Sequence, residues 1–321
     1  MKLLVVITLL LTTSTSFAEY KPTKTIFGHP DLEGLWSNST ITPLERPHSA
    51  RGATISKEAA TVLEDQSNQF IKDDQIPIDP EAPAPTDRDT SKGYEAFWVD
   101  RGTSFAVING EIRSSLISYP ENGKIPYKGI TQGKLHDFLH NIQYGFDGPE
   151  QRPPGERCIV GYGSSGGPPM LPVLYNNHIQ IIQNKDHVLL HVEMNHDARI
   201  VRLNSQHIPI PVYLGDSIGT WDSNTLVVTT KHLHPGQNCK ASMTNWFCMS
   251  ENAVITERFT RINENEILYE FEVEDPDAFT DVWRGEIPLR TAEGPIYEYA
   301  CHEGNYGMAN ILSGARQQEK Q

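Results

Sequence analysis

Short apolar-rich runs separated by turn residues follow one another through the second half of the chain, and this pattern predicts a mainly β protein. In the segment 267–273, every second residue from Ile267 to Val273 is apolar and bulky, as in a strand with one buried face. Similar short runs recur, separated by turn residues such as Asn109-Gly110. The expected strands are residues 105–108, 112–119, 179–183, 188–193, 199–203, 220–221, 225–230, 253–262, 267–273, 282–289 and 296–301.

Short turns join most of these strands, which favours antiparallel hairpins over a parallel sheet. About eight hairpin-linked strands are enough to close a barrel, and a two-sheet sandwich is the alternative. Gly34-Leu-Trp36 matches the Gly-x-Trp pattern at the first strand of lipocalin-type barrels, and Gly219-Thr-Trp221 repeats it. The sequence therefore predicts an antiparallel, lipocalin-like β-barrel domain over residues 97–321.

Residues 19–96 lack this alternation and are expected to form an irregular N-terminal arm that packs on the barrel. Pro, Asp, Thr and Ser are frequent there, which is typical of loops and extended chain. One helix is expected at residues 56–71, with Ser56 as its N-cap. A second short helix is expected at residues 133–144.

Residues 1–18 have the pattern of a secretory signal peptide. Lys2 provides the basic start, residues 3–11 are almost entirely apolar, and Ser16 and Ala18 place small residues before a cleavage site. We expect cleavage after Ala18 and a periplasmic or secreted protein, with an uncleaved anchor as the alternative. No later stretch of the sequence is apolar for long enough to span a bilayer, so no stable membrane insertion is expected.

The acidic balance of the chain argues against several classes of partner. Asp and Glu number 41 against 27 Lys and Arg, which makes a formal net charge of −14. Phosphate backbones and anionic lipid surfaces repel such a protein. We therefore expect a small-molecule ligand or substrate, and no nucleic acid.

The four cysteines are expected to form disulfides, because an even number in an exported protein favours pairing. Cys239 and Cys248 are close in sequence, which favours their pairing and leaves Cys158 with Cys301. Zinc bound by cysteines is the alternative. The chain has no Cys-x-x-Cys pair, however, and we expect no metal centre.

Six blocks of sequence together resemble a large group of exported bacterial proteins of similar length, which carry the same blocks in the same order. The resemblance covers most of the chain after the signal segment and implies one whole module. It transfers no catalytic residues. The blocks are Pro30-Asp-Leu-Glu-Gly-Leu-Trp36, Phe97-Trp-Val-Asp-Arg-Gly102, Gly167-Pro-Pro-Met-Leu-Pro172, His196-Asp-Ala-Arg199, Gly215-Asp-Ser-Ile-Gly-Thr-Trp221 and Cys301-His-Glu-Gly-Asn-Tyr-Gly307.

The last of these blocks carries a dense set of groups that can move protons. His302 supplies an imidazole, the side-chain group best suited to exchange a proton at neutral pH, and Glu303 supplies a carboxylate that can orient or assist it. Asn305 and Tyr306 can hold a developing oxyanion. We predict that His302, Glu303 and Tyr306 are catalytic and that Asn305 binds the ligand. The alternative is a C-terminal turn whose polar side chains form hydrogen bonds with the backbone and hold the end of the chain in place.

A second cluster lies at the junction of two expected strands, between Glu193 and Arg199. His196 and Asp197 are predicted as an acid/base and its partner, and Arg199 as a group that binds a carboxylate or an enolate. Glu193 is predicted to contact the ligand. A β-turn with a satisfied histidine and an Arg–Asp ion pair is the alternative.

Two further arginines, Arg101 and Arg113, are predicted to bind the ligand. Arginines directed into a mostly apolar barrel would favour an anionic molecule. The alternative is that they form surface salt bridges.

Together these residues favour an exported enzyme that needs no cofactor and performs acid/base chemistry of lyase, isomerase or cyclase type. Its expected substrate is a small, partly apolar or hydroxylated molecule. In this hypothesis His196 and His302 form the acid/base pair, assisted by the adjacent carboxylates. One alternative is a non-catalytic, lipocalin-like periplasmic binder of a hydrophobic ligand. Another is an envelope protein whose acidic surface meets a partner.

Overall fold

The computed structural model describes residues 20–74, 81, 99–303 and 305–320. The predicted signal peptide and its cleavage site lie outside these residues, as does most of the segment 75–98. None of the helices in the described part of the chain has the length and apolarity that a bilayer crossing requires.

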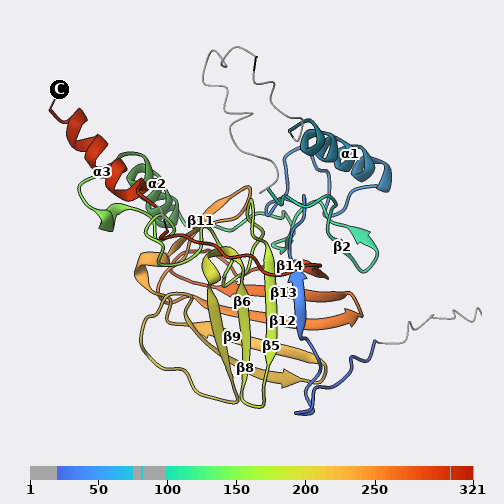
Figure 1. The fold of residues 1–321 in the computed structure, drawn as a ribbon. Coiled ribbons are helices and arrows are strands. Elements are labelled where there is room, and N and C mark those ends of the chain that lie inside the picture. Colours follow the sequence, from blue (N-terminus) through green and yellow to red (C-terminus); the bar gives the residue numbers. More distant parts are fainter. Residues whose placement is uncertain (1–19, 75–80, 82–98, 304, 321) are drawn as a thin grey trace, which may run out of the picture.

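Nine strands of the described residues form a closed β-barrel (Figure 1), which confirms the predicted fold class. Pairing of β1 with β14, with Trp36 beside Thr291 and Ser37 beside Arg290, closes the ring. In order around the barrel the strands are β1 (Gly34–Ser37), β5 (His178–Gln183), β6 (His187–Val192), β7 (Ala198–Leu203), β8 (Asp216–Asp222), β9 (Thr225–Lys231), β12 (Val254–Asn263), β13 (Glu266–Glu274) and β14 (Trp283–Thr291).

One pair of neighbours is parallel, and for this pair the prediction of antiparallel hairpins is wrong. β7 and β8 run in the same direction, with Arg202 beside Ile218. The connection 204–215 between them carries two prolines and is longer than a tight turn. It returns the chain to the end of the barrel at which β7 began, and a parallel neighbour requires such a crossing.

Smaller elements lie around the barrel. The predicted turn at Asn109-Gly110 is confirmed, but the expected strand 112–119 is divided, because its second half leaves the hairpin and pairs with β14. The small strands are β2 (Val107–Ile108), β3 (Glu111–Ile112), β4 (Ile117–Tyr119), β10 (Cys239–Ala241) and β11 (Trp246–Cys248).

Both predicted helices are present, and a third follows the barrel. Ser56 Oγ accepts a hydrogen bond from Ala59 N at 3.2 Å, so the predicted N-cap is confirmed. The third helix was not expected, and it forms although it contains Gly307 and Gly314, residues that disfavour a helix. The helices are α1 (Lys57–Asp74), α2 (Gly129–Tyr144) and α3 (Gly307–Gln318), with short 3-10 turns η3 (Pro149–Gln151), η4 (Met194–His196) and η5 (Pro235–Gln237).

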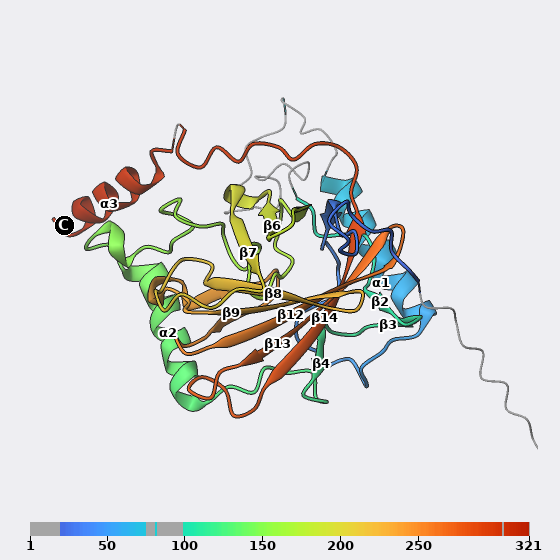
Figure 2. The same cartoon turned by 90° about the horizontal axis from the view of Figure 1, so that it is seen from below.

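The segment after β14 is an extended strap, which we define as residues 292–303, and the strand expected at 296–301 is wrong. The backbone N–H groups of Tyr297 and Tyr299 donate to the side chains of Glu193 and His196 instead of to a strand ladder. Figure 2 shows the strap running from the end of β14 across β6 and β7 to α3.

The inward-facing residues of the strands fill the barrel with apolar side chains. Trp36 of the Gly-x-Trp pattern is fully buried, and its indole Nε1 donates to Leu32 O at 3.0 Å. The guanidinium of Arg261 lies over the same ring, 5.3 Å from its centre. Phe271 and Trp283 pack edge to face with ring centres 5.4 Å apart. The barrel is therefore held by a core to which distant strands contribute.

Candidate functional site

The predicted site residues lie in separate regions of the fold. His302 and Asn305 line a cleft outside the barrel. Glu193 and His196 hold the strap, and Arg199 lies inside the barrel. Of the two histidines predicted as an acid/base pair, the cleft is thus lined by His302 and not by His196.

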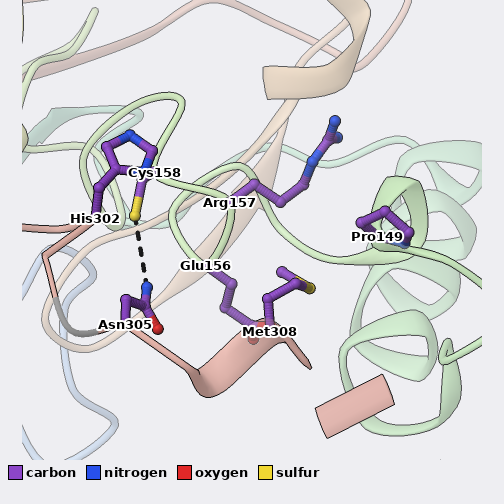
Figure 3. A pocket seen from close by; sticks show the side chains of 7 residues that line it. All are labelled: Pro149, Glu156, Arg157, Cys158, His302, Asn305 and Met308. Atoms are coloured by element: carbon purple, nitrogen blue, oxygen red, sulfur yellow. Dashed lines mark hydrogen bonds between the residues drawn. The ribbon is translucent and has the colours of Figure 1, made fainter. Parts of the chain in front are cut away.

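The cleft lies where the loop between α2 and β5 meets the start of α3 (Figure 3), and its volume is about 280 Å³. A disulfide between Cys158 and Cys301 joins these two parts of the chain. This bond and the Cys239–Cys248 bond confirm both predicted pairings. Two disulfides are typical of an oxidising, extracellular environment. The lining residues are Pro149, Glu156, Arg157, Cys158, His302, Asn305 and Met308.

Two polar residues of the cleft are held by neighbours. Glu156 accepts two hydrogen bonds from the guanidinium of Arg152, at 2.8 and 3.0 Å. Asn305 Nδ2 donates to Cys158 Sγ at 3.6 Å, and Asn305 Oδ1 accepts from Gly307 N at 2.9 Å at the start of α3. Asn305 therefore positions the start of α3 against the disulfide, which fixes that wall of the cleft.

The other two ionisable groups of the cleft, His302 and Arg157, form no side-chain hydrogen bond or ion pair with the residues that the structure describes. Figure 3 shows the two side chains on opposite sides of Cys158, with the Arg157 guanidinium extending away from His302. A guanidinium can bind a carboxylate at one end of a ligand, and an imidazole can exchange a proton at the other. Arg157 was not among the predicted site residues.

Glu303 and Tyr306 do not line the cleft, although they flank residues that do. The Glu303 side chain is exposed, and that of Tyr306 is 74% exposed. A hydroxyl in water has lost the low-dielectric surroundings that make an oxyanion-stabilising hydrogen bond strong. Neither of these two described side chains forms a hydrogen bond or ion pair with the imidazole of His302.

Glu193 and His196 anchor the strap at the end of β6. Glu193 Oε1 accepts a hydrogen bond from Tyr297 N at 3.1 Å, and His196 Nε2 accepts one from Tyr299 N at 3.0 Å. The turn η4 brings His196 to the strap, because Asn195 and His196 have left-handed φ angles of 58° and 53°. Both side chains serve as acceptors for backbone groups here.

Glu193 is also paired with His178 of β5, whose Nδ1 lies 3.0 Å from Glu193 Oε2. The contact with the Glu193 carboxylate raises the pKa of His178, and partial burial opposes this effect. Burial disfavours the ionised form of Glu193, but the contact with His178 and the hydrogen bond from Tyr297 N outweigh it and hold its pKa below the ordinary value. Glu193 is therefore an ionised anchor.

We expect the His178–Glu193 pair to stabilise the fold most between pH 4.5 and 6.5, the ordinary pKa values of the two groups. Because the folded pKa of His178 is raised, its contribution is complete below 6.5 and is lost as the pH rises through the higher folded value. Because the folded pKa of Glu193 is lowered, its contribution is complete above 4.5 and is lost as the pH falls through the lower folded value.

His178→Gln should therefore lower the free energy of unfolding by on the order of 1 kcal/mol near pH 5.5, and by less near pH 8.5. Urea unfolding of both proteins at the two pH values measures the difference. His136→Gln, on the exposed side of α2, is the matched control and should have no effect at either pH. An equal loss at both pH values would contradict the assignment of the pair.

Inside the barrel, Arg199 and Glu257 form a two-pronged ion pair with N–O distances of 2.7 and 2.8 Å. Their side chains are 1% and 0% exposed. The Tyr269 hydroxyl donates to Glu257 Oε1 at 2.7 Å and accepts from Met170 N at 2.8 Å. Burial raises the pKa of Tyr269, so the hydroxyl stays protonated. Arg199 was predicted to bind a carboxylate or enolate of the substrate, but in the structure it binds the carboxylate of Glu257.

Asp197 holds the Gly-rich loop 161–170 over this interior pair. Its Oδ2 accepts from Gly161 N at 2.7 Å, and its Oδ1 accepts from Asn195 Nδ2 at 3.2 Å. Burial raises the pKa of the Asp197 carboxyl, and these hydrogen bonds oppose the shift. No hydrogen bond is found between Asp197 and the imidazole of His196, and both residues belong to the described chain.

Three buried polar residues of the interior were not predicted: Glu257, Tyr269 and Lys240. Lys240 Nζ donates to two carbonyl oxygens of the Gly-rich loop, at 2.6 and 3.1 Å. Burial, with the charge of Arg199, lowers the pKa of Lys240 to about 7. The sequence carries a signal for Glu257, an acid in the inward phase of strand 253–262. For Lys240 it carries none.

The two other predicted arginines lie elsewhere. Arg113 forms ion pairs with Glu286 at 3.0 Å and with Glu111 at 3.2 Å, beside β14. It therefore forms the salt bridges that were the alternative to ligand binding. Arg101 is half-buried in the extended segment before β2. Neither residue lines the cleft at His302.

Metal binding receives no support from the described chain, in which no three His, Cys, Asp or Glu side chains are grouped to hold an ion. Comparison with known proteins adds no assignment, because no protein-family model and no curated protein matches the chain. The interpretation of the cleft depends on its own geometry.

Proposed function

We propose that the protein is an exported enzyme that performs acid/base chemistry, of lyase or isomerase type, on a small anionic molecule in the cleft. The observation that carries this proposal is the pair His302 and Arg157, two groups without partners among the described residues that line one cavity. The disulfides support an extracytoplasmic location, as does the signal-like sequence of residues 1–18.

In this proposal the guanidinium of Arg157 binds the carboxylate of the substrate and His302 acts on its other end. The neutral imidazole removes a proton from a carbon or a hydroxyl group and returns it to the product. Asn305 holds the start of α3 and thereby the wall of the cleft beside His302. The hypothesis from sequence assigned Arg199 a catalytic role. The present proposal gives it none, because its guanidinium is buried inside the barrel and paired with Glu257.

Hydrogen–deuterium exchange of carbon-bound protons tests the proposal even while the product is unidentified. Lactate, pyruvate, malate and 3-hydroxybutyrate are incubated with the protein in deuterated water and followed by proton NMR. We expect exchange in at least one probe, slowed by about 10²–10⁴-fold in His302→Gln. Arg157→Gln should weaken probe binding by about tenfold or more.

His136→Gln, an exposed histidine on α2, is the control and should leave exchange and binding unchanged. If the wild-type protein binds none of the probes, or if both cleft variants bind and exchange them as well as wild type, the proposal is wrong.

A second candidate function is non-catalytic binding of the same class of anion. It is favoured by the absence, among the described residues, of a carboxylate hydrogen-bonded to the His302 ring. A general base is usually oriented by such a partner. Binding that depends on Arg157, without any proton exchange, would support this function over the enzyme.

A further inference from the structure

Three attachments hold the strap at alternate residues. Tyr297 N donates to Glu193, Tyr299 N donates to His196, and Cys301 is bonded to Cys158. In an extended chain, the backbone N–H groups of every second residue point to the same side, so Tyr297 N and Tyr299 N donate along one edge of the strap, and the disulfide of Cys301 follows them in the chain. The next residue along the chain is His302 of the cleft. The position of His302 therefore depends on how firmly the strap is held.

The attachments differ in what a change of pH does to them. A neutral imidazole nitrogen without a proton accepts a hydrogen bond, but a protonated imidazole has N–H groups on both nitrogens and accepts none. When His196 is protonated, its Nε2–H faces Tyr299 N–H, so an attraction becomes a repulsion between two donors. Glu193 is held ionised by His178 and keeps its bond to Tyr297 under the same conditions.

We propose that His196 is a pH-sensitive clamp: the neutral imidazole holds the strap at Tyr299, and its protonation frees this part of the strap and loosens the cleft at His302. The clamp itself does not depend on the proposed function, but its effect on a ligand does. Because Cys301 remains bonded to Cys158, the strap loosens without leaving the protein. A ligand of the cleft is then held tightly near neutral pH and weakly in acid.

The groups that face His196 fit this assignment. The ring of His191, on β6, stacks with that of His196 at a distance of 6.0 Å between centres. Burial, followed by the charge of His196, lowers the pKa of His191, so protonation of His191 is disfavoured. The carboxyl of Asp197 is bound to Gly161 N, and Glu193 is shared between His178 and the strap.

Amide exchange of the two strap tyrosines tests the clamp directly, in the absence of any ligand. Tyrosine is labelled with ¹⁵N in the full chain, and exchange is followed by NMR near pH 8 and pH 5, relative to the intrinsic exchange rate at each pH. In the wild-type protein we expect protection of the Tyr299 amide to fall by about tenfold or more at the lower pH. The Tyr297 amide should stay protected and serves as the internal reference.

Two substitutions separate the hydrogen bond from its titration. In His196→Gln, the amide oxygen can accept from Tyr299 N but does not titrate, so Tyr299 should be protected equally at both pH values. In His196→Ala, Tyr299 should exchange fast at both. If His196→Ala fails to fold, the wild type and His196→Gln still decide the question. Unchanged Tyr299 protection in wild type, or an equal fall in His196→Gln, would overturn the clamp.

Binding of the carboxylate probes at the two pH values separates this inference from the proposed function. If the Tyr299 amide responds to pH as expected but no probe binds, the clamp is supported and the proposed function is wrong. If a probe binds in the cleft but Tyr299 protection does not change, the proposed function is supported and the clamp is wrong.

Discussion

Replacing Glu257 with alanine should lower the free energy of unfolding by about 3–5 kcal/mol. The substitution leaves the guanidinium of Arg199 fully buried without an opposite charge and removes the acceptor of the Tyr269 hydroxyl. It also removes a charge that favours the protonated form of Lys240 in the same interior. Because the whole stability of a domain is about 5–15 kcal/mol, this is a large fraction of it.

A matched series separates the charge of Glu257 from its volume. Glu257→Gln keeps the shape and one acceptor, so its loss should be smaller than that of Glu257→Ala. The double variant Arg199→Met, Glu257→Leu removes both charges together and should recover much of the stability. Urea unfolding followed by tryptophan fluorescence measures all three. If the double variant is as unstable as Glu257→Ala, lost packing and not an unpaired charge explains the effect.

The barrel was predictable because alternation within a strand is local, as in residues 267–273, where each inward side chain falls at every second position. The parallel pairing of β7 with β8 was not, because it depends on the path of the connection 204–215. Residues 296–301 of the strap were expected to form a strand, but their extended chain joins no ladder. The hydrogen-bond acceptors of the strap, Glu193 and His196, lie about a hundred residues away in sequence.

The candidate site shows the limit of reasoning from neighbours in sequence. His196, Asp197 and Arg199 are almost adjacent, yet they serve the strap, the Gly-rich loop and the barrel interior. Successive side chains of a strand point to opposite faces of the sheet, and residues in a turn can point in yet another direction. Residues that are adjacent in sequence therefore need not share a site.

Residues far apart in sequence form the cleft instead. Arg157 and His302 each adjoin a cysteine of the same disulfide, Cys158 or Cys301. The predicted pairing of these cysteines was therefore enough, in principle, to place Arg157 near His302 from the sequence alone. The course of the chain beside Arg157 could not be predicted, since Cys158 has a left-handed backbone with a φ of 55°.

Replacing Cys158 and Cys301 together with serine should lower the free energy of unfolding by about 5 kcal/mol in the chain-entropy model, because the bond closes a loop with a sequence separation of 143. The strap would then be held near the cleft by the hydrogen bonds of Tyr297 and Tyr299 and by the packing of Tyr299 on the core. We expect the cleft to lose probe binding at a lower urea concentration than the one that unfolds the barrel.

The Cys239→Ser, Cys248→Ser variant is the matched control, because that bond spans a sequence separation of 9 and includes no residue of the strap. The same model gives it about half the effect, about 2.5 kcal/mol. Urea unfolding gives both losses, and probe binding in low urea reports on the cleft. If the two variants lose equal stability, loop closure does not explain the difference. If the cleft of the Cys158→Ser, Cys301→Ser variant binds probes until the barrel unfolds, the disulfide does not position His302, and the remaining contacts of the strap and α3 are sufficient to hold it.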